Sequence, residues 1–387
     1  MRSFLFVLWI FVGSPSSEVS DFEAQIIDSN VAIGYGIAVG DVDGDGKPDI
    51  LMADKKQFVW YRNGDWKKFI MIENLTIQDN VCIAAQDVNG DGKVEVAVGA
   101  QWNPAETKDK EKSGSVHFLI RPEDPTQVWK AIPLYHEPTI HRMRWISSSN
   151  GTYYLIVLPL HGKDNSGGMG KGVNMLVFQY PALLQKADPA FIIPTEMHLT
   201  HNFDFAGFRD PVKKQIYLGG KEGIGFVAPD FNQQSKVMPL KIRDNQGTGE
   251  IRLSNSGLGK SFIAAIEPMH GNNLVVYTDD GNTRKVLDSN LNEGHAVVAA
   301  DILGLGYDQL VAGWRKPDKD GKVGVKLYSK KSASATEWEQ QWIDENEMAC
   351  EDLQVMDLNG DGKLDIIASG RATHNLKIYW NNSRGKK

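Results

Sequence analysis

Short apolar runs separated by polar turns dominate the chain, and helical periodicity is weak. A small-apolar run such as Ile37–Val39 leads into a polar loop, and a second run such as Ile50–Ala53 follows it. Two strand-length runs around a tight turn predict an antiparallel strand pair. The same unit returns at Arg142–Trp145 with Leu155–Leu158, and again further along the chain. The pattern predicts an all-β fold.

The strand pairs repeat along the whole chain. Seven units follow one another, and their spacing of roughly 45 to 60 residues matches propeller blades. Each outer strand has aromatic or basic residues, then an apolar pair, often with an aspartate after it, as in Arg284–Asp288. These features predict a seven-bladed β-propeller with four-stranded blades.

The last repeat is incomplete at its C-terminal end. It ends at Trp380 without an outer strand, whereas Phe22–Asp28 fits the outer-strand pattern. We therefore expect this N-terminal strand to complete the last blade and close the ring, which leaves only short, protected sheet edges. The prediction is a single propeller domain over residues 21–381, followed by a short basic tail over residues 382–387.

The N-terminal residues 1–17 have the features of a secretory signal peptide. Arg2 precedes the apolar run Phe4–Val12, and the small residues of Gly13–Ser17 suit cleavage. The alternative is a buried N-terminal strand. The run is too short to span a bilayer, and no other stretch is apolar enough, so we expect a secreted or periplasmic protein without a membrane span.

Charge and cysteine content narrow the possible partners. The formal net charge is −7 and no basic stripe is present, which argues against nucleic-acid binding. Only Cys82 and Cys350 occur, and we expect both to be reduced and buried. The sequence does not determine whether they pair, nor the oligomeric state.

Three loops carry a repeated aspartate motif typical of calcium sites. Acids or asparagine stand at loop positions 1, 3, 5 and 9, and glycines at positions 4 and 6 permit the sharp turn. The flanking strands and the missing acid at position 12 disfavour an EF-hand. A metal-free Asx-turn is the alternative. The predicted ligands of up to three structural calcium ions are Asp41, Asp43, Asp45 and Asp49; Asp87, Asn89, Asp91 and Glu95; and Asp357, Asn359, Asp361 and Asp365.

These loops resemble the FG-GAP/VCBS repeats of integrin-like and bacterial secreted propellers. The resemblance implies a propeller fold and calcium, but no particular activity. In the other four units the ligands are lost, and we expect no ion there.

Histidines recur at one offset in several units. His201 and His295 each lie six residues before their loop start, His141 lies five or six before it, and Glu351 also lies six before it. Equal offsets place side chains on one ring around the central channel. Three imidazoles with an open position are typical of catalytic zinc, so we predict His141, His201 and His295 as zinc ligands. Unrelated, solvated channel histidines are the alternative.

The second strand of each unit should end at the same mouth of the channel. Trp102 and Trp314 would stack on a sugar ring there, while arginine and glutamate bind hydroxyls. Core packing between blades is the alternative for both tryptophans. The candidate residues at these strand ends are His161 and His270 for catalysis, and Trp102, Glu267, Trp314, Arg315, Arg371 and His374 for substrate binding.

Five segments resemble the propeller domain of fungal aldos-2-ulose dehydratase and its bacterial relatives. They are Leu160–Lys163, Thr200–Phe203, Glu267–Gly271, Gly294–Val297 and Gly370–Asn375. The resemblance implies a zinc ion that polarises a sugar keto group and a nearby histidine that moves protons. We expect no cupin or lectin domain in this chain, so only dehydratase chemistry is carried over.

The sequence therefore favours a zinc-dependent lyase acting on a keto-sugar or oxidised glycoside. His161, or failing that His270, would abstract the proton, and Glu351 would be a fourth ligand or would orient a ligand. One alternative is a non-catalytic, calcium-stabilised propeller that binds carbohydrate or protein. Another is a calcium-dependent polysaccharide lyase, which Arg315 and Arg371 favour. The sequence does not identify the substrate.

Overall fold

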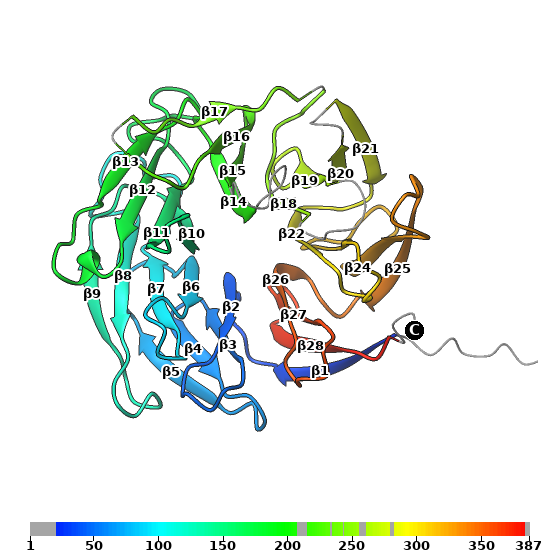
Figure 1. Ribbon diagram of the computed structural model, residues 1–387, viewed down its shortest axis with the longest axis horizontal. Helices are drawn as coiled ribbons and strands as arrows, with labels where there is room; N and C mark the ends of the chain where they lie inside the picture. Colours follow the sequence, from blue (N-terminus) through cyan, green and yellow to red (C-terminus); the bar gives the residue numbers. More distant parts are fainter. Residues whose placement is uncertain are drawn as a thin grey trace, which may run out of the picture.

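Seven four-stranded antiparallel sheets surround a central axis in the computed structural model (Figure 1). The structure describes residues 21–206, 215–232, 234–242, 244–254, 261–278 and 282–383, so the predicted signal peptide lies outside it. The predicted all-β, seven-bladed architecture is confirmed. Within the described part of the chain, no helix has the length and apolar character needed to cross a membrane.

Each blade contributes one strand to each of four concentric layers, numbered here as blades 1 to 7 from the first complete repeat. The inner strands are β2 (Gly36–Gly40), β6 (Cys82–Gln86), β10 (Ile140–Ser147), β14 (Thr200–Ala206), β18 (Ile251–Leu253), β22 (Gly294–Ala300) and β26 (Cys350–Met356). The second strands are β3 (Asp49–Ala53), β7 (Glu95–Ala100), β11 (Tyr153–Pro159), β15 (Gln215–Gly220), β19 (Ile263–Glu267), β23 (Gln309–Trp314) and β27 (Asp365–Gly370).

The two peripheral layers complete the blades. The third strands are β4 (Gln57–Tyr61), β8 (Ser115–Ile120), β12 (Asn174–Gln179), β16 (Gly223–Val227), β20 (Asn273–Thr278), β24 (Gly324–Lys330) and β28 (Asn375–Asn381). The outer strands are β5 (Lys68–Glu73), β9 (Lys130–Leu134), β13 (Phe191–Pro194), β17 (Met238–Pro239), β21 (Thr283–Asp288), β25 (Trp338–Glu345) and, for blade 7, β1 (Phe22–Asp28). A single 3₁₀ turn, η1 (Ala182–Leu184), follows β12 in the described chain.

The N-terminal strand closes the ring as predicted. β1 pairs antiparallel with β28, in a register that runs from Phe22 opposite Asn381 to Ile26 opposite Lys377 (Figure 1). The order of strands in blade 7 is β1-β28-β27-β26, so this sheet joins the two ends of the described chain. A β-strand edge that would otherwise be open on β28 is thereby covered.

The core lies between blades. Leu51 and Trp60 of blade 1 share one apolar cluster with Val96 and Val98 of blade 2, and all four are fully buried. Each sheet packs against a neighbour on either side, so its second and third strands are apolar on both faces. This explains why the middle strands appear in the sequence as continuous apolar runs.

A buried aspartate clamp links neighbouring blades. Asp344, on outer strand β25 of blade 6, accepts hydrogen bonds from Tyr379 Oη at 2.7 Å and Lys377 Nζ at 2.9 Å, both on β28 of blade 7. The aspartate is the residue that follows the apolar pair in the outer-strand pattern. The same clamp joins blades 5 and 6, and blades 7 and 1; its members there are Asp288, Lys326 and Tyr328, and Asp28, Tyr61 and Lys68.

Both cysteines are free and buried, as expected from the sequence. Burial raises the pKa of the Cys82 thiol to about 12. Cys82 packs in the cluster between blades 2 and 3, and Cys350 in the cluster between blades 6 and 7. Each thiol therefore serves as a small apolar side chain of the core.

Candidate functional site

Side chains at the start of the inner strands meet around one mouth of the channel. The ring centroids of His141 and His201 lie 4.7 Å apart, and those of His201 and His295 lie 5.4 Å apart. Nδ1 of His295 is 2.5 Å from the backbone oxygen of Glu351. The structure thus brings together the four residues that share one offset in the sequence repeat.

A β-bulge lies at each of these four positions. In β10, for example, regular pairing with β11 is interrupted between Ile140 and Arg142, and His141 is the extra residue. β2 and β6, by contrast, pair regularly from their first residues. A bulge redirects the side chain of the unpaired residue, and bulges are frequent beside active sites. The residues at the four bulges are His141, His201, His295 and Glu351.

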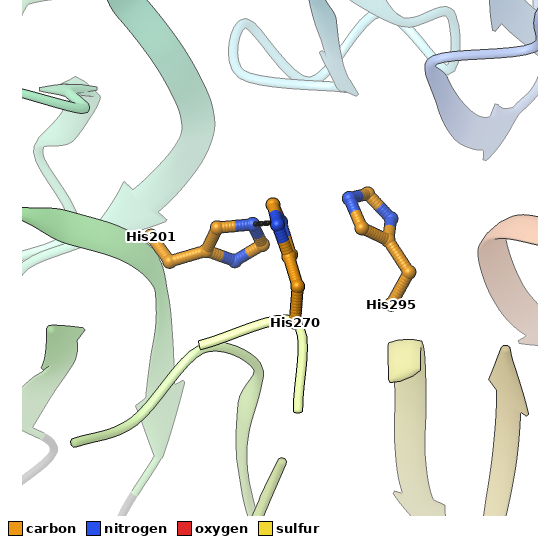
Figure 2. A group of neighbouring side chains, drawn as sticks. All are labelled: His201, His270 and His295. Carbon is orange, nitrogen blue, oxygen red and sulfur yellow. Dashed lines mark hydrogen bonds between the residues drawn. The ribbon is translucent and has the colours of Figure 1, made fainter. Parts of the chain in front are cut away.

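Three histidines form the tightest group at this mouth (Figure 2). His201 and His295 come from β14 and β22, and His270 enters from the loop that follows β19. One nitrogen of each lies within 4.8 Å of the others, and Nε2 of His201 is 2.6 Å from Nε2 of His270. His141, predicted as the third zinc ligand, lies beside this group. His270, which was predicted for proton transfer, is the third member of the group that could hold a metal ion.

The imidazoles of this site are neutral, and several have a defined tautomer. Nδ1 of His141 is 2.8 Å from the backbone oxygen of His201, and Nδ1 of His295 faces the oxygen of Glu351. A carbonyl only accepts, so Nδ1 carries the proton and Nε2 keeps a lone pair. Burial lowers the pKa of all four histidines, for His270 to about 2. They therefore offer unprotonated nitrogens at neutral pH.

Glu250 is a buried site residue that the sequence analysis missed. Its Oε1 lies 3.1 Å from Nδ1 of His201, without the alignment of a regular hydrogen bond. Asn202 donates to Oε2 at 2.6 Å, and Arg252 and Arg142 lie at 3.4 and 3.7 Å. Burial alone would raise the pKa of Glu250, but His201 and the two arginines hold it well below the usual range. Glu250 is thus a carboxylate behind His201.

Glu351 is held by the two arginines predicted to bind substrate. Its carboxylate lies 3.4 Å from Arg315 Nη1 and accepts a 3.0 Å bond from Arg371 Nη1. The side chain is buried, and burial raises its pKa while the arginines oppose that shift. Because its backbone oxygen orients His295, the geometry favours an orienting role for Glu351 over a ligand role. Nε of Arg315 is buried without a hydrogen-bond partner.

Three further candidates lie around this mouth with different contacts. Trp102 stacks on His141 with centroids 5.1 Å apart. His161 is partly buried, its segment pairs with Leu199, and its Nδ1 has no partner. His374 places Nδ1 3.0 Å from the backbone oxygen of Val31. Trp102 is therefore linked directly to the histidine group.

The structure corrects two predicted substrate-binding residues. Trp314 is fully buried, packs on Trp342 and donates through Nε1 to the backbone oxygen of Lys322 at 3.0 Å. Glu267 is also fully buried, and its carboxylate binds Arg284 at 2.8 Å. Neither side chain offers a surface to a sugar. Core packing between blades, the alternative for the tryptophans, is correct for Trp314.

The aspartate loops are well-defined turns on the blades. In the first loop, Asp41 accepts hydrogen bonds from the backbone N–H groups of Gly44 at 2.6 Å and Gly46 at 2.8 Å. Carboxylate oxygens of Asp41, Asp43 and Asp49 lie within 4.8 Å of one another. Asp49 is completely buried, which raises its pKa to about 7. The other two loops repeat the hydrogen bonds of the first.

Comparison with known proteins places the chain in a class. A family model described as an FG-GAP-like repeat matches residues 41–98, which include the first two aspartate loops. No curated protein sequence matches the chain. The fold and this repeat together define a seven-bladed β-propeller with an FG-GAP-like repeat.

Solved structures with the same fold are distant in sequence. A chain of "Crystal Structure of Mitotic Checkpoint Complex" superposes with a TM-score of 0.59 at 9% identity, covering 98% of each chain. A chain of "Crystal structure of BBS1N in complex with ARL6DN, soaked with mercury" gives a TM-score of 0.58 at 13% identity, covering 94% of this chain and 97% of that one. At these identities the likeness shows the fold alone.

Proposed function

We propose that this protein is a secreted, zinc-dependent carbohydrate lyase whose metal ligands are His201, His270 and His295. The observation that supports the proposal is the convergence of three neutral imidazoles, with ligand nitrogens within 4.8 Å of one another. Three histidines with one open position make up a frequent catalytic zinc site. In this proposal His270 replaces His141 in the ligand set expected from the sequence.

The residues present suit a bound zinc ion. Histidines that bind zinc usually donate their other ring nitrogen to a carboxylate or a backbone oxygen. Glu250 stands in that position behind His201, and the backbone oxygen of Glu351 does so behind His295. Both arrangements leave Nε2 as the ligand atom. Burial keeps the rings unprotonated, which metal binding requires.

The chain itself would bind the sugar and move the proton. When bound, zinc would polarise a keto oxygen of the substrate and make the adjacent C–H more acidic. A neutral imidazole would take that proton, the β C–O bond would break, and the imidazolium would protonate the leaving oxygen. His161, with an unpartnered Nδ1 and a pKa lowered by burial, suits this role, as does His141, whose Nδ1 is engaged by a backbone oxygen so that Nε2 keeps its lone pair.

Replacement of His201 by alanine should abolish zinc binding. Purified wild type, loaded with zinc and desalted, should retain one zinc per chain, and H201A should bind it at least about a hundredfold more weakly, since even outer partners of a ligand are worth ten- to hundredfold. The measurement is metal analysis together with competition against a chromophoric chelator. His198→Ala, a partly exposed histidine paired with Glu222, is the matched control. A wild type that takes up no zinc, or an H201A variant that keeps it, contradicts the proposal.

A non-catalytic, calcium-stabilised propeller is the second candidate, because the FG-GAP-like repeat at residues 41–98 carries no activity of its own. The two functions separate in one assay. Zinc-loaded protein incubated with oxidised glycosides should generate an unsaturated ketone, followed by its ultraviolet absorbance. Binding of the glycoside without product would favour the second candidate.

We also propose that the three aspartate loops hold structural calcium. Calcium should raise the midpoint of thermal unfolding of chelator-treated protein, since a ligand at a hundred times its Kd contributes about 2.7 kcal/mol per site. The triple variant D41N/D87N/D357N keeps one of the two oxygen acceptors for the loop N–H groups but removes one carboxylate per loop, so its calcium response should be lost. Asp188→Asn, at an exposed position, is the control. An undiminished calcium response in the triple variant would overturn the proposal.

A further inference from the structure

The central channel contains a charged cavity next to the histidine group. Its volume is about 230 Å³, and the inner strands of blades 1, 2, 3 and 7 form most of its wall. Arg142 and Arg144 project into it from alternate positions of β10, and Arg252 joins them from β18. Asp352 is the carboxylate among its lining residues.

Two of the three guanidinium groups have carboxylate neighbours. Arg142 and Arg252 lie 3.7 and 3.4 Å from the carboxylate oxygens of Glu250. The carboxylate of Asp352 accepts the backbone N–H of Ile37 at 2.7 Å. The negative charges around the cavity are thus largely engaged elsewhere.

Arg144 makes no ion pair within 4.0 Å with a described residue, although Asp204, Asp352 and Glu250 act on its charge from farther away. Its Nε donates to the backbone oxygen of Phe203 at 3.0 Å, and its guanidinium lies 5.9 Å from that residue's ring centroid. The nearest acid on β14, Asp204, is bound to the backbone N–H of Leu253 at 2.9 Å. Burial, followed by repulsion from Arg252, lowers the pKa of Arg144 to about 10, and the three carboxylates oppose this shift. The two Nη groups of Arg144 therefore face the cavity as unused donors.

We propose that this cavity binds a small oxyanion, a carboxylate or sulfate group, between Arg144 and Arg252. Arg144 is partly buried, and a partly desolvated charge without an ion pair gains from a bound anion. The planar fork of a guanidinium matches the paired oxygens of such a group. The cavity has room for one small oxyanion and several waters, each of which occupies about 30 Å³. This site adjoins the proposed zinc centre through Glu250, but none of its guanidinium groups is a proposed metal ligand.

Anion binding is tested on the full chain after removal of metals, so that the zinc proposal cannot influence the outcome. Sodium sulfate, sodium acetate and sodium glucuronate are titrated by calorimetry against sodium chloride at equal ionic strength. We expect saturable one-to-one binding of sulfate. If glucuronate binds more tightly than acetate, the anion is the acid group of a sugar; if they bind equally, it is a free ion.

The variant Arg144→Met should weaken sulfate binding about ten- to hundredfold, the range expected for lost hydrogen bonds to a charged group. Without anion it should unfold at a temperature close to that of wild type, because it removes a partly buried charge that makes no ion pair. Arg62→Met, at an exposed ion pair, is the control. If the Met variant does not fold, Arg144→Lys should still bind sulfate at least about fivefold more weakly than wild type, because lysine lacks the planar, two-pronged guanidinium. The proposal is wrong if sulfate gives no more binding heat than chloride, or if both Arg144 variants bind sulfate with the affinity of wild type.

Discussion

Deletion of residues 21–28 should lower the midpoint of thermal unfolding by about 5 °C or more. The deletion removes the outer strand of blade 7, leaves the edge of β28 unpaired, and takes Phe22 out of the apolar cluster that it shares with Tyr379. It also removes Asp28, the clamp between blades 7 and 1. A loss on the order of 5 kcal/mol corresponds to a shift of this size in a domain of several hundred residues.

Thermal unfolding followed by circular dichroism measures this effect. The control is Ile26→Asn, which keeps β1 but changes a side chain that is 59% exposed, so its free energy of unfolding should change by no more than about 0.5 kcal/mol. An unchanged midpoint for the deletion would mean that pairing between β1 and β28 does not hold the ring closed.

Replacement of Asp344 by alanine should cost about 3–5 kcal/mol of unfolding free energy. Lys377 has only 2% of its side chain exposed, and it would keep Glu347 as its remaining acid partner. The hydroxyl of Tyr379 would lose its acceptor inside the core. Removing one partner of a buried ion pair is strongly destabilising, because the other charge stays buried.

Chemical denaturation measures this loss. Glu339→Ala, on the same strand at an exposed ion pair, should change the free energy of unfolding by less than about 1 kcal/mol. The triple variant D344L/K377M/Y379F replaces the clamp with apolar groups and should recover most of the stability. If Asp344→Ala alone loses less than about 1 kcal/mol, the clamp is not what joins blades 6 and 7.

The blade architecture could be predicted because each blade needs the same pattern of apolar strands and tight turns. Every unit needs apolar faces on its middle strands and a tight turn after its inner strand, so the pattern returns seven times. The closing strand was visible because Phe22–Asp28 carries the outer-strand pattern, including its final aspartate. The structure supplies the reason for that aspartate, which is the clamp to the next blade.

Only the site residues that occupy an equivalent position in the repeat could be predicted from the sequence. His141, His201, His295 and Glu351 share an offset, whereas His270 reaches the group from a loop in which its own φ is 52°. Spacing along strands does not predict such a turn, and it does not reveal Glu250, which directly precedes β18. Trp314 was misjudged because a position at the end of a strand does not determine whether the side chain faces the channel or a neighbouring blade.

At the four bulges, the side chain at the channel mouth belongs to a residue that takes no part in the pairing of its sheet. Regular pairing resumes one residue beyond each bulge, so the extra residue can change identity without altering the register of its blade. Blades 1 and 2 pair regularly, keep complete aspartate loops and contribute no histidine to this ring. Evolution or design would thus alter the chemistry one blade at a time, by substituting the single residue at a bulge, while the scaffold stays the same.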